Sequence, residues 1–449
     1  MADNLTQLCE RLRADTEGLT NEQAFDTLKM LLGDGIRFRY ELVNEPVNAQ
    51  ANAHGDSHDD LQDDSQESTR DESTTSNSRF GHLNSRKISR VVLTTVKSPT
   101  TDYSRELVRQ CNGVVLQFPE WKVLSMPSPG FNLRYRLNDV KKNLSQYKVY
   151  EIKDGSTITL YWYEPANTWC MSSANGFDVS GYQWLGKSTY ADAFNQVSKL
   201  YPDFSFDRLD KTRSYTVGFR HPDFHPLATD QSKIWLIQAH DLETLQPTDV
   251  TIGIPHQTTL DATDWDKMME KNKLAMTKYM TPEQRIHYGY VLRGDCGELS
   301  NIILESELLK SIRQMVYDLP KHRIPNAAPI TPYTRIEYIA LRSYLSTTRF
   351  TFINLFPQFA AMHKRYDEMC KRLADRIIST IRKRLSFKIL TPADRLVAGY
   401  ADHISKSGVD VLKADGESIV LDFLRDKSNL DLLYSCMIAP VGQTVQDTK

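Results

Sequence analysis

The stretch Tyr150-Glu151-Ile152-Lys153-Asp154-Gly155-Ser156 stands between two apolar runs that are rich in β-branched and aromatic residues. Such runs are typical of β-strands, so we predict strands over Val149–Ile152 and Thr157–Tyr163. The residues Asp154-Gly155-Ser156 favour a turn followed by the start of the second strand. The chain therefore carries a charged turn, with Lys153 in it, between two predicted strands.

Strand-like segments of the same kind recur as far as about residue 305. The others are Ile36–Val43, Ile88–Val96, Gly113–Phe118, Lys122–Ser125, Ser214–Phe219, Lys233–Gln238 and Gly289–Leu292. Helical patterns interrupt them at Tyr190–Leu200 and Trp265–Met276. Near the N-terminus, Thr20-Asn21-Glu22-Gln23 predicts a helix cap with Gln at the third position, and Gly33 predicts the end of that helix.

From about Glu307 onward the pattern becomes helical, with its longest apolar stripe over Phe359–Leu385. The sequence therefore predicts an α+β body followed by an all-helical C-terminal part. With 449 residues and 40% hydrophobic content, two or three domains with real cores are expected.

Charge and cysteine content exclude several classes of protein. The net charge is −2, so the whole chain is not a nucleic-acid-binding polycation and any basic surface is local. The six cysteines are dispersed without a CxxC pair, which indicates buried thiols in a reducing compartment. No apolar run approaches the ~20 residues of a membrane span. We expect an intracellular protein, cytoplasmic or nuclear, that is not bound to a membrane.

The segment from about residue 44 to 85 is dominated by acidic and small polar residues, as in Asp59-Asp60-Leu61-Gln62-Asp63-Asp64. Such a composition predicts disorder, because little in it can be buried to offset the entropy of ordering. Since predicted strands flank it, we interpret it as a long loop inserted between two strands. A passive loop is favoured over an acidic competitor for a basic groove.

Several motifs occur in an order that resembles the RNA ligase 1 family of bacteriophages and large viruses, which are covalent nucleotidyltransferases. The matching stretches are Arg109-Gln110-Cys111-Asn112-Gly113, Trp121–Asn132, the Lys-Asp-Gly turn, Tyr215–Pro222 with the strand after it, Tyr288-Gly289-Tyr290-Val291 and Ile303–Ser306. The resemblance covers about residues 88–310 and a helical C-terminal domain of the expected size. It implies a ligase-type fold of antiparallel sheets with helices, over residues 1–310, and a helical domain over residues 311–449.

The residues on which ligation depends are replaced. In such ligases the nucleophilic lysine stands two residues before the aspartate, and here that place holds Ile152. Two glutamates of the family are replaced by Gly218 and Tyr288, the paired lysines by Ile303 and Glu305, and two upstream cations by Asn112 and Gly130. Loss of the nucleophile alone can lower turnover on the order of a millionfold. The resemblance places the nucleotide at Arg109, Ile152, Asp154, Gly155, Gly218 and Tyr288.

Lys153 is the remaining candidate for the nucleophile. Side chains alternate between the faces of a strand, so a shift of one residue is expected to turn its amine away from the pocket, unless a bulge restores it. An ordinary solvated lysine is therefore favoured over a nucleophile or a non-covalent phosphate contact. Asp154 and Gly155 are likewise favoured as turn residues over residues that bind a sugar. Tyr288 is favoured as an aromatic side chain that fills the pocket over one that stacks on a base.

Two further groups of residues are candidate binding sites. His221, Asp223 and His225 lie close together, but adjacent prolines indicate a loop and no Cys or Glu completes a shell, so no metal site is expected. The C-terminal helix carries a concentration of basic residues, for which a solvated outer face is the favoured interpretation. The alternative, which the family resemblance implies, is a surface that binds the phosphates of structured RNA. Its candidate RNA-binding residues are Lys371, Arg372, Arg376, Arg382, Lys383 and Arg384.

The favoured hypothesis is a catalytically inactive RNA-ligase-like protein that binds structured RNA or a protein partner and needs no cofactor. The first alternative is an active RNA ligase that forms a lysyl-AMP intermediate through Lys153 and requires ATP and Mg²⁺. The second alternative is a structural component of a larger assembly. The distribution of the resembled family also suggests a virus-associated protein.

Overall fold

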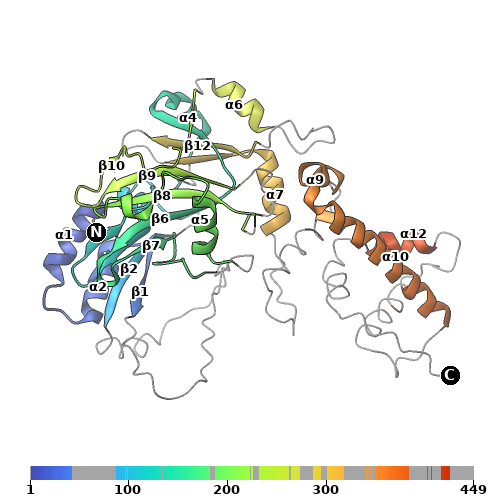
Figure 1. The fold of residues 1–449 in the computed structure, drawn as a ribbon, viewed down its shortest axis with the longest axis horizontal. Helices are drawn as coiled ribbons and strands as arrows, with labels where there is room; N and C mark the ends of the chain where they lie inside the picture. Colours follow the sequence, from blue (N-terminus) through green and yellow to red (C-terminus); the bar gives the residue numbers. More distant parts are fainter. Residues whose placement is uncertain are drawn as a thin grey trace, which may run out of the picture.

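All named strands pair antiparallel, in three sheets within the part of the chain that the computed structural model describes. The described residues are 2–42, 87–96, 98, 100–132, 135–182, 188–222, 224–225, 232–261, 264–273, 287–294, 301–317, 340, 343–344, 349–383, 402, 406 and 416–424. The predicted α+β class with antiparallel sheets and C-terminal helices is confirmed (Figure 1). The predicted disorder of residues 44–85 lies outside the described residues.

The first sheet has the strand order β1-β2-β3-β4. Its strands are β1 (Ile36–Leu42), β2 (Ile88–Thr95), β3 (Asn112–Gln117) and β4 (Lys122–Ser125). The predicted acidic segment thus connects two strands that pair directly, β1 and β2. The short helix α3 (Glu106–Gln110) precedes β3.

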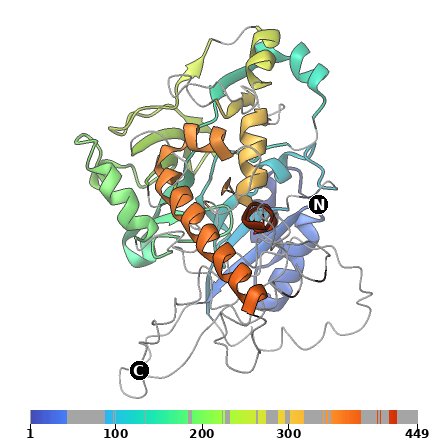
Figure 2. The ribbon, with the colours of Figure 1, turned by 90° about the vertical axis from the view of Figure 1, so that its right-hand side faces the viewer.

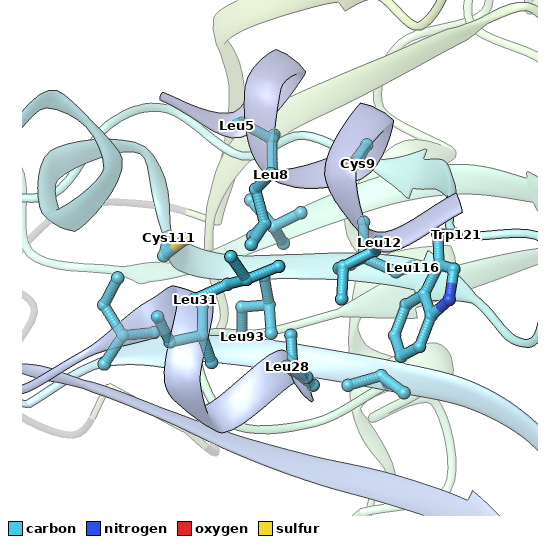
Figure 3. Packing of buried hydrophobic residues seen from close by; sticks show 14 of the residues in the cluster. Leu5, Leu8, Cys9, Leu12, Leu28, Leu31, Leu93, Cys111, Leu116 and Trp121 are labelled. Atoms are coloured by element: carbon cyan, nitrogen blue, oxygen red, sulfur yellow. The ribbon is translucent and has the colours of Figure 1, made fainter. Parts of the chain in front are cut away.

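Helices α1 (Leu5–Asp15) and α2 (Asn21–Leu32) cover one face of this sheet (Figure 3). The predicted cap of α2 is confirmed, because Thr20 and Gln23 form a reciprocal capping box and Gly33 ends the helix with φ 64°. Leu8 and Leu31 pack against Leu93 and Leu116 of the sheet in a cluster that water does not reach. Burial of these side chains fixes which face of the first sheet turns toward the helices.

The second sheet has the order β10-β9-β8-β6-β7. Its strands are β6 (Ser156–Tyr163), β7 (Thr168–Ser172), β8 (Arg213–Arg220), β9 (Lys233–Asp241) and β10 (Pro247–Thr248). Helix α5 (Tyr190–Ser198) packs on one face through Phe194, near Ile158 and Leu160 of β6. The alternate residues of β6 point the other way: Tyr161 packs toward the first sheet.

The third sheet has the order β11-β5-β12-β13. Its strands are β5 (Tyr147–Glu151), β11 (Thr259–Leu260), β12 (Gly289–Gly294) and β13 (Ile302–Glu305), and helices α4 (Leu137–Lys142) and α6 (Trp265–Asn272) pack on it. Since β5 belongs to this sheet and β6 to the second, the charged turn predicted between them crosses from one sheet to the other.

The helices after β13 are α7 (Glu307–Tyr317), α9 (Arg349–Leu355), α10 (Ala360–Lys383) and α12 (Gly416–Leu424). In Figure 2, α10 runs across the front of the molecule with α12 beside it, and the two share a buried cluster. Helix α7 continues through residue 310, and the boundary predicted there stays a prediction. The change from a strand-like to a helical pattern, predicted at about Glu307, coincides with the start of α7.

The sequence also predicts buried cysteines and no membrane-spanning segment. Cys9, Cys111, Cys170 and Cys370 are buried free thiols, as expected, and the other two cysteines lie outside the described residues. Among the described helices, none combines the length and apolar character that crossing a membrane requires.

Candidate functional site

A cavity of about 820 Å³ is bounded by the second and third sheets and by the segment that follows β4. Strands β6, β8 and β9 contribute side chains from one sheet, and β12 and β13 contribute them from the other. Positions that the family resemblance assigned to the catalytic motifs line this cavity: Asn112, Gly130, Ile152, Ile303 and Glu305. Residues from distant parts of the sequence are thus gathered around one hollow.

Both Ile152 and Lys153 line the cavity. Strand β5 ends at Glu151 and β6 begins at Ser156, so the turn between them has no strand pairing to impose alternation. Hydrogen bonds hold the turn: the Ile152 amide donates to the Gly289 carbonyl at 2.9 Å, and Arg220 Nε donates to the Asp154 carbonyl at 2.8 Å. The prediction that Lys153 faces away from the pocket is therefore wrong, because it applied strand geometry to an irregular segment.

The Lys153 amine lies over the ring of Trp235, 5.1 Å from the ring centroid. Partial burial lowers the pKa of Lys153, and the positive charges of Lys233 and Arg220 lower that pKa further, while Glu151 acts in the opposite direction. Desolvation and like charge are also the effects that activate a lysine as a nucleophile. Lys153 is thus an exposed residue on the lining of the cavity with a partly desolvated amine, and the favoured interpretation as an ordinary solvated lysine stays a prediction.

The indole of Trp235 covers two glycines. A Cβ atom added at Gly218 would lie 2.2 Å from the Trp235 ring, and one added at Gly155 would lie 2.6 Å from it. Gly218 and Trp235 are direct partners across β8 and β9. A longer side chain at position 218 cannot be accommodated while the indole stays in place, so Trp235 lines the cavity where Gly218 was predicted to contact the nucleotide.

The remaining predicted nucleotide-binding residues contribute in other ways. Gly155 lines the cavity, whereas Arg109, Asp154 and Tyr288 are not among its lining residues. Arg109 donates to the carbonyls of Tyr103 and Ser104, at 3.0 and 2.6 Å. Tyr288 packs in a cluster formed mainly by the C-terminal helices. Arg109 and Tyr288 are therefore placed to support the walls of the cavity.

The C-terminal helices pack against the wall of the cavity that carries Ile152. The buried cluster around Tyr288 includes Leu308 of α7, Phe352 of α9 and Tyr366 of α10, and Ile152 packs against it. In the resembled ligases this position belongs to the lysine nucleophile, whereas here an apolar side chain joins the cavity to the helical cluster. The apolar environment stabilises Ile152 by burial and would oppose an ammonium group at the same place.

Among the cavity residues that sequence reasoning did not assign to the site are Trp235, Arg293 and Lys310. Arg293 lies two residues after Val291 in β12, and both line the cavity, so period-two alternation from the Tyr288-Gly289-Tyr290-Val291 motif could have identified it. Lys310 is in the first turns of α7 and its amine lies 2.8 Å from Glu307. The cavity thus holds three cationic side chains beside Glu305.

The histidines considered for a metal site have other partners. His221 Nε2 lies 3.0 Å from Gln196 Oε1, and His225 Nε2 lies 3.1 Å from Ser156 Oγ. Asp223 lies outside the described residues. Within the ranges that the structure describes, no group of three or more His, Cys, Asp or Glu residues is arranged to hold a metal ion.

Helix α10 is amphipathic, with Tyr366, Cys370, Ala374 and Ile377 buried on one side. The opposite side, called here the basic face, exposes six cations: Lys364, Arg365, Lys371, Arg372, Arg376 and Arg382. The helix sequence holds seven Lys and Arg residues against three Asp and Glu, so the face carries net positive charge. The Lys383 side chain and Arg384 lie outside the described residues.

Comparison with known proteins identifies relatives in African swine fever virus. A protein of strain Badajoz 1971 Vero-adapted named "Putative RNA-ligase" is 29% identical over 323 residues, which cover 64% of this chain and 70% of that protein. The chain is an RNA-ligase-like protein. A relative of the same name from isolate Tick/Malawi/Lil 20-1/1983 is 27% identical over 321 residues. No family model matches this RNA-ligase-like chain.

Solved structures of RNA ligases are less similar to this chain. An archaeal ATP-dependent RNA ligase has 10% identity and a TM-score of 0.34, over 72% of this chain and 82% of that one. A Naegleria gruberi RNA ligase with PPi has 11% identity and a TM-score of 0.27, over 41% and 55%. Both TM-scores lie below 0.5, so nothing further is inferred from them.

Proposed function

We propose that this RNA-ligase-like chain binds phosphate-bearing ligands, RNA above all, and does not transfer a nucleotide to itself. The observation that carries the proposal is the packing of Trp235 on Gly218, which fills the place of a family glutamate with an indole. Ile152, in the place of the nucleophile, packs into an apolar helical cluster. Both replacements keep the walls of the cavity and remove groups on which ligation depends.

The cationic side chains support a polyanionic ligand. Lys153, Arg293 and Lys310 line the cavity, where one carboxylate, that of Glu305, accompanies them among the described lining residues. The basic face of α10 adds exposed Lys and Arg residues along a helix of about 36 Å. Clustered cations of this kind bind the RNA backbone through its phosphates, without reading base sequence. The viral relatives support a virus-associated role.

A second candidate function is ATP-dependent RNA ligation through Lys153, and one observation favours it. The Lys153 amine lies inside the cavity with a lowered pKa, so part of it is free to act as a nucleophile. In such a step the amine nitrogen forms a bond to the α-phosphorus of ATP, the bond to the β-phosphate oxygen breaks, and pyrophosphate leaves. The amine proton passes to solvent. ATP and Mg²⁺ would be needed for this step.

Covalent labelling separates the two functions. The protein is incubated with α-labelled ATP and Mg²⁺ and then denatured, and an active RNA ligase serves as the positive control. We expect no label on this chain. A labelled band that Lys153→Met abolishes, and that Lys148→Met on the exposed side of β5 leaves in place, would overturn the proposal in favour of ligation.

A further inference from the structure

Arg293 of β12 is a cation inside the cavity whose described partners are all neutral. Its two terminal nitrogens donate to the Ile237 carbonyl at 3.1 Å and to Gln257 Oε1 at 3.0 Å. Its guanidinium stacks on the ring of Tyr150, with 4.9 Å to the centroid. Burial lowers the pKa of Arg293 to about 10, which leaves it charged at neutral pH. Its positive charge is therefore held without a carboxylate from the described part of the chain.

The third nitrogen of the Arg293 guanidinium also lacks a described partner. Its Nε is buried and has no hydrogen-bond partner among the residues that the structure describes. A buried charge and a buried N–H group each lose the solvation of water, and both losses are offset when an anion accepts from the guanidinium. Arginine is suited to such a role because its planar fork binds phosphate through two parallel hydrogen bonds.

Arg293 and Gln257 also connect the two sheets that bound the cavity. Gln257 Nε2 donates to the Glu151 carbonyl of β5 at 3.3 Å, while Arg293 reaches β9 through Ile237. A purely structural cross-link explains these two hydrogen bonds. It does not explain a full positive charge on the lining of the cavity. An uncharged side chain would serve as well for cross-linking.

Lys153 is a second cation of the cavity, and it contacts the same strand, β9, that Arg293 reaches. Lys153 lies over Trp235, and Arg293 bonds the carbonyl of Ile237, two residues further along β9. Two residues of a strand span about 7 Å, and both Trp235 and Ile237 line the cavity. The cavity therefore presents two cations whose contacts on β9 lie two residues apart, which suits a ligand with more than one negative charge.

We propose that Arg293 is a phosphate-binding residue, which takes a terminal or bridging phosphate of the ligand that enters the cavity. The inference rests on the proposed function and deepens it by naming the anchor. The ligand presents a phosphate group with at least two negative charges. Its source is either a nucleoside triphosphate or the 5′-phosphate of an RNA strand, and the experiment distinguishes these sources.

Binding is measured by calorimetry with four ligands: inorganic pyrophosphate, ATP, and one RNA oligonucleotide with and without its 5′-phosphate. We expect Arg293→Met to weaken binding of the preferred phosphate ligand at least tenfold, and Arg293→Lys to weaken it less. Arg39→Met, which removes an exposed cation from β1, is the matched control and should bind as the wild type does. Preference for the 5′-phosphorylated RNA identifies an RNA end, and preference for ATP identifies a nucleotide.

Melting temperatures of all variants are recorded in parallel, because Arg293 also cross-links two sheets. If Arg293→Met lowers the melting temperature but its folded fraction binds as the wild type does, Arg293 is structural and the inference is wrong, while the proposed function stands. If the wild type binds none of the four ligands, both are wrong. If covalent labelling occurs and Arg293→Met still weakens binding, only the non-catalytic part of the proposed function fails.

Discussion

The Lys153 amine lies 5.1 Å from the centroid of the Trp235 ring, inside a cavity bounded by two sheets. The indole desolvates the amine on one side, and its ring face attracts the charged form on the same side. Burial and the neighbouring cations Lys233 and Arg220 lower the pKa of the amine. The contact with Trp235 therefore affects the reactivity of Lys153, the lysine of the charged turn.

Lys153 should titrate below the ordinary lysine value of 10.5. A lowered pKa means that more of the amine is neutral at a given pH, so its reductive methylation should rise with pH earlier than that of a free lysine. Mass spectrometry of peptides labelled at pH 7 to 11 gives the midpoint. Trp235→Ala should move this midpoint upward, because water then reaches the amine. A wild-type midpoint at or above 10.5 would contradict the described environment.

Gly218→Ala should destabilise the protein by about 3 kcal/mol, the upper range for overpacking a core. The added Cβ would lie 2.2 Å from the ring of Trp235, a residue that is 5% exposed. In a Trp235→Ala background the same substitution should cost less than about 1 kcal/mol, because the clashing atoms are gone. Urea denaturation of the four proteins measures the coupling. Additive effects would mean that the two residues do not touch.

Two buried histidines should make the protein less stable in mild acid. Burial lowers the pKa of His240 and of His363 to about 4, and these side chains are 2% and 3% exposed. Between pH 6.5 and 4 the unfolded chain binds protons that the folded chain does not. Stability is therefore complete above pH 6.5 and should fall by about 1.4 kcal/mol per pH unit for each histidine.

Urea midpoints at pH 7, 6 and 5 test this dependence. His240→Gln should lower the slope of stability against pH by about one proton. The remaining dependence comes from His363 and from His225, whose pKa burial also lowers. His256→Gln, at an exposed position, is the control. A slope that His240→Gln leaves unchanged would show that His240 is not held neutral by burial.

The basic face of α10 should contribute phosphate contacts to RNA binding. Replacing Lys371, Arg372 and Arg376 together by Gln should reduce the slope of log K against log salt by about 2, at roughly 0.7 per lost contact. Fluorescence anisotropy with a structured RNA at several salt concentrations measures the slope. A control triple of Lys29, Arg39 and Lys142, which are exposed elsewhere, should leave it unchanged. Equal slopes for both triples would exclude the basic face as the RNA surface.

Local features were predictable from the sequence. The capping box at Thr20 and the strand Lys122–Ser125 have the predicted bounds, because capping and alternation depend on neighbouring residues alone. Helix α1 was missed although Asn4 caps it and Leu5, Leu8 and Leu12 follow at helical spacing. Strand β7 (Thr168–Ser172) was missed as well, although it is one residue longer than the predicted strand Lys122–Ser125.

The candidate site was only partly predictable. Motif order indicated that Asn112, Gly130, Ile152, Ile303 and Glu305 belong together, and all of them line the cavity. The direction of Lys153 was predicted wrongly, since the turn crosses between two sheets. Its backbone is held there by the Ile152 amide, which donates to the Gly289 carbonyl, and by the Asp154 carbonyl, which accepts from Arg220. No periodic rule describes such a segment.

By itself the sequence determined the α+β class, most strands, the long C-terminal helix with its basic side, and the kinship with RNA ligases. These features depend on residue order and short-range periodicity. Only the tertiary structure decided that Trp235 closes over Gly218, that Lys153 enters the cavity and that Arg293 lies in it without an acidic partner among the described residues. The physical reason is that burial and pairing of a charge depend on side chains brought together from distant strands, and one strand's pattern does not contain them.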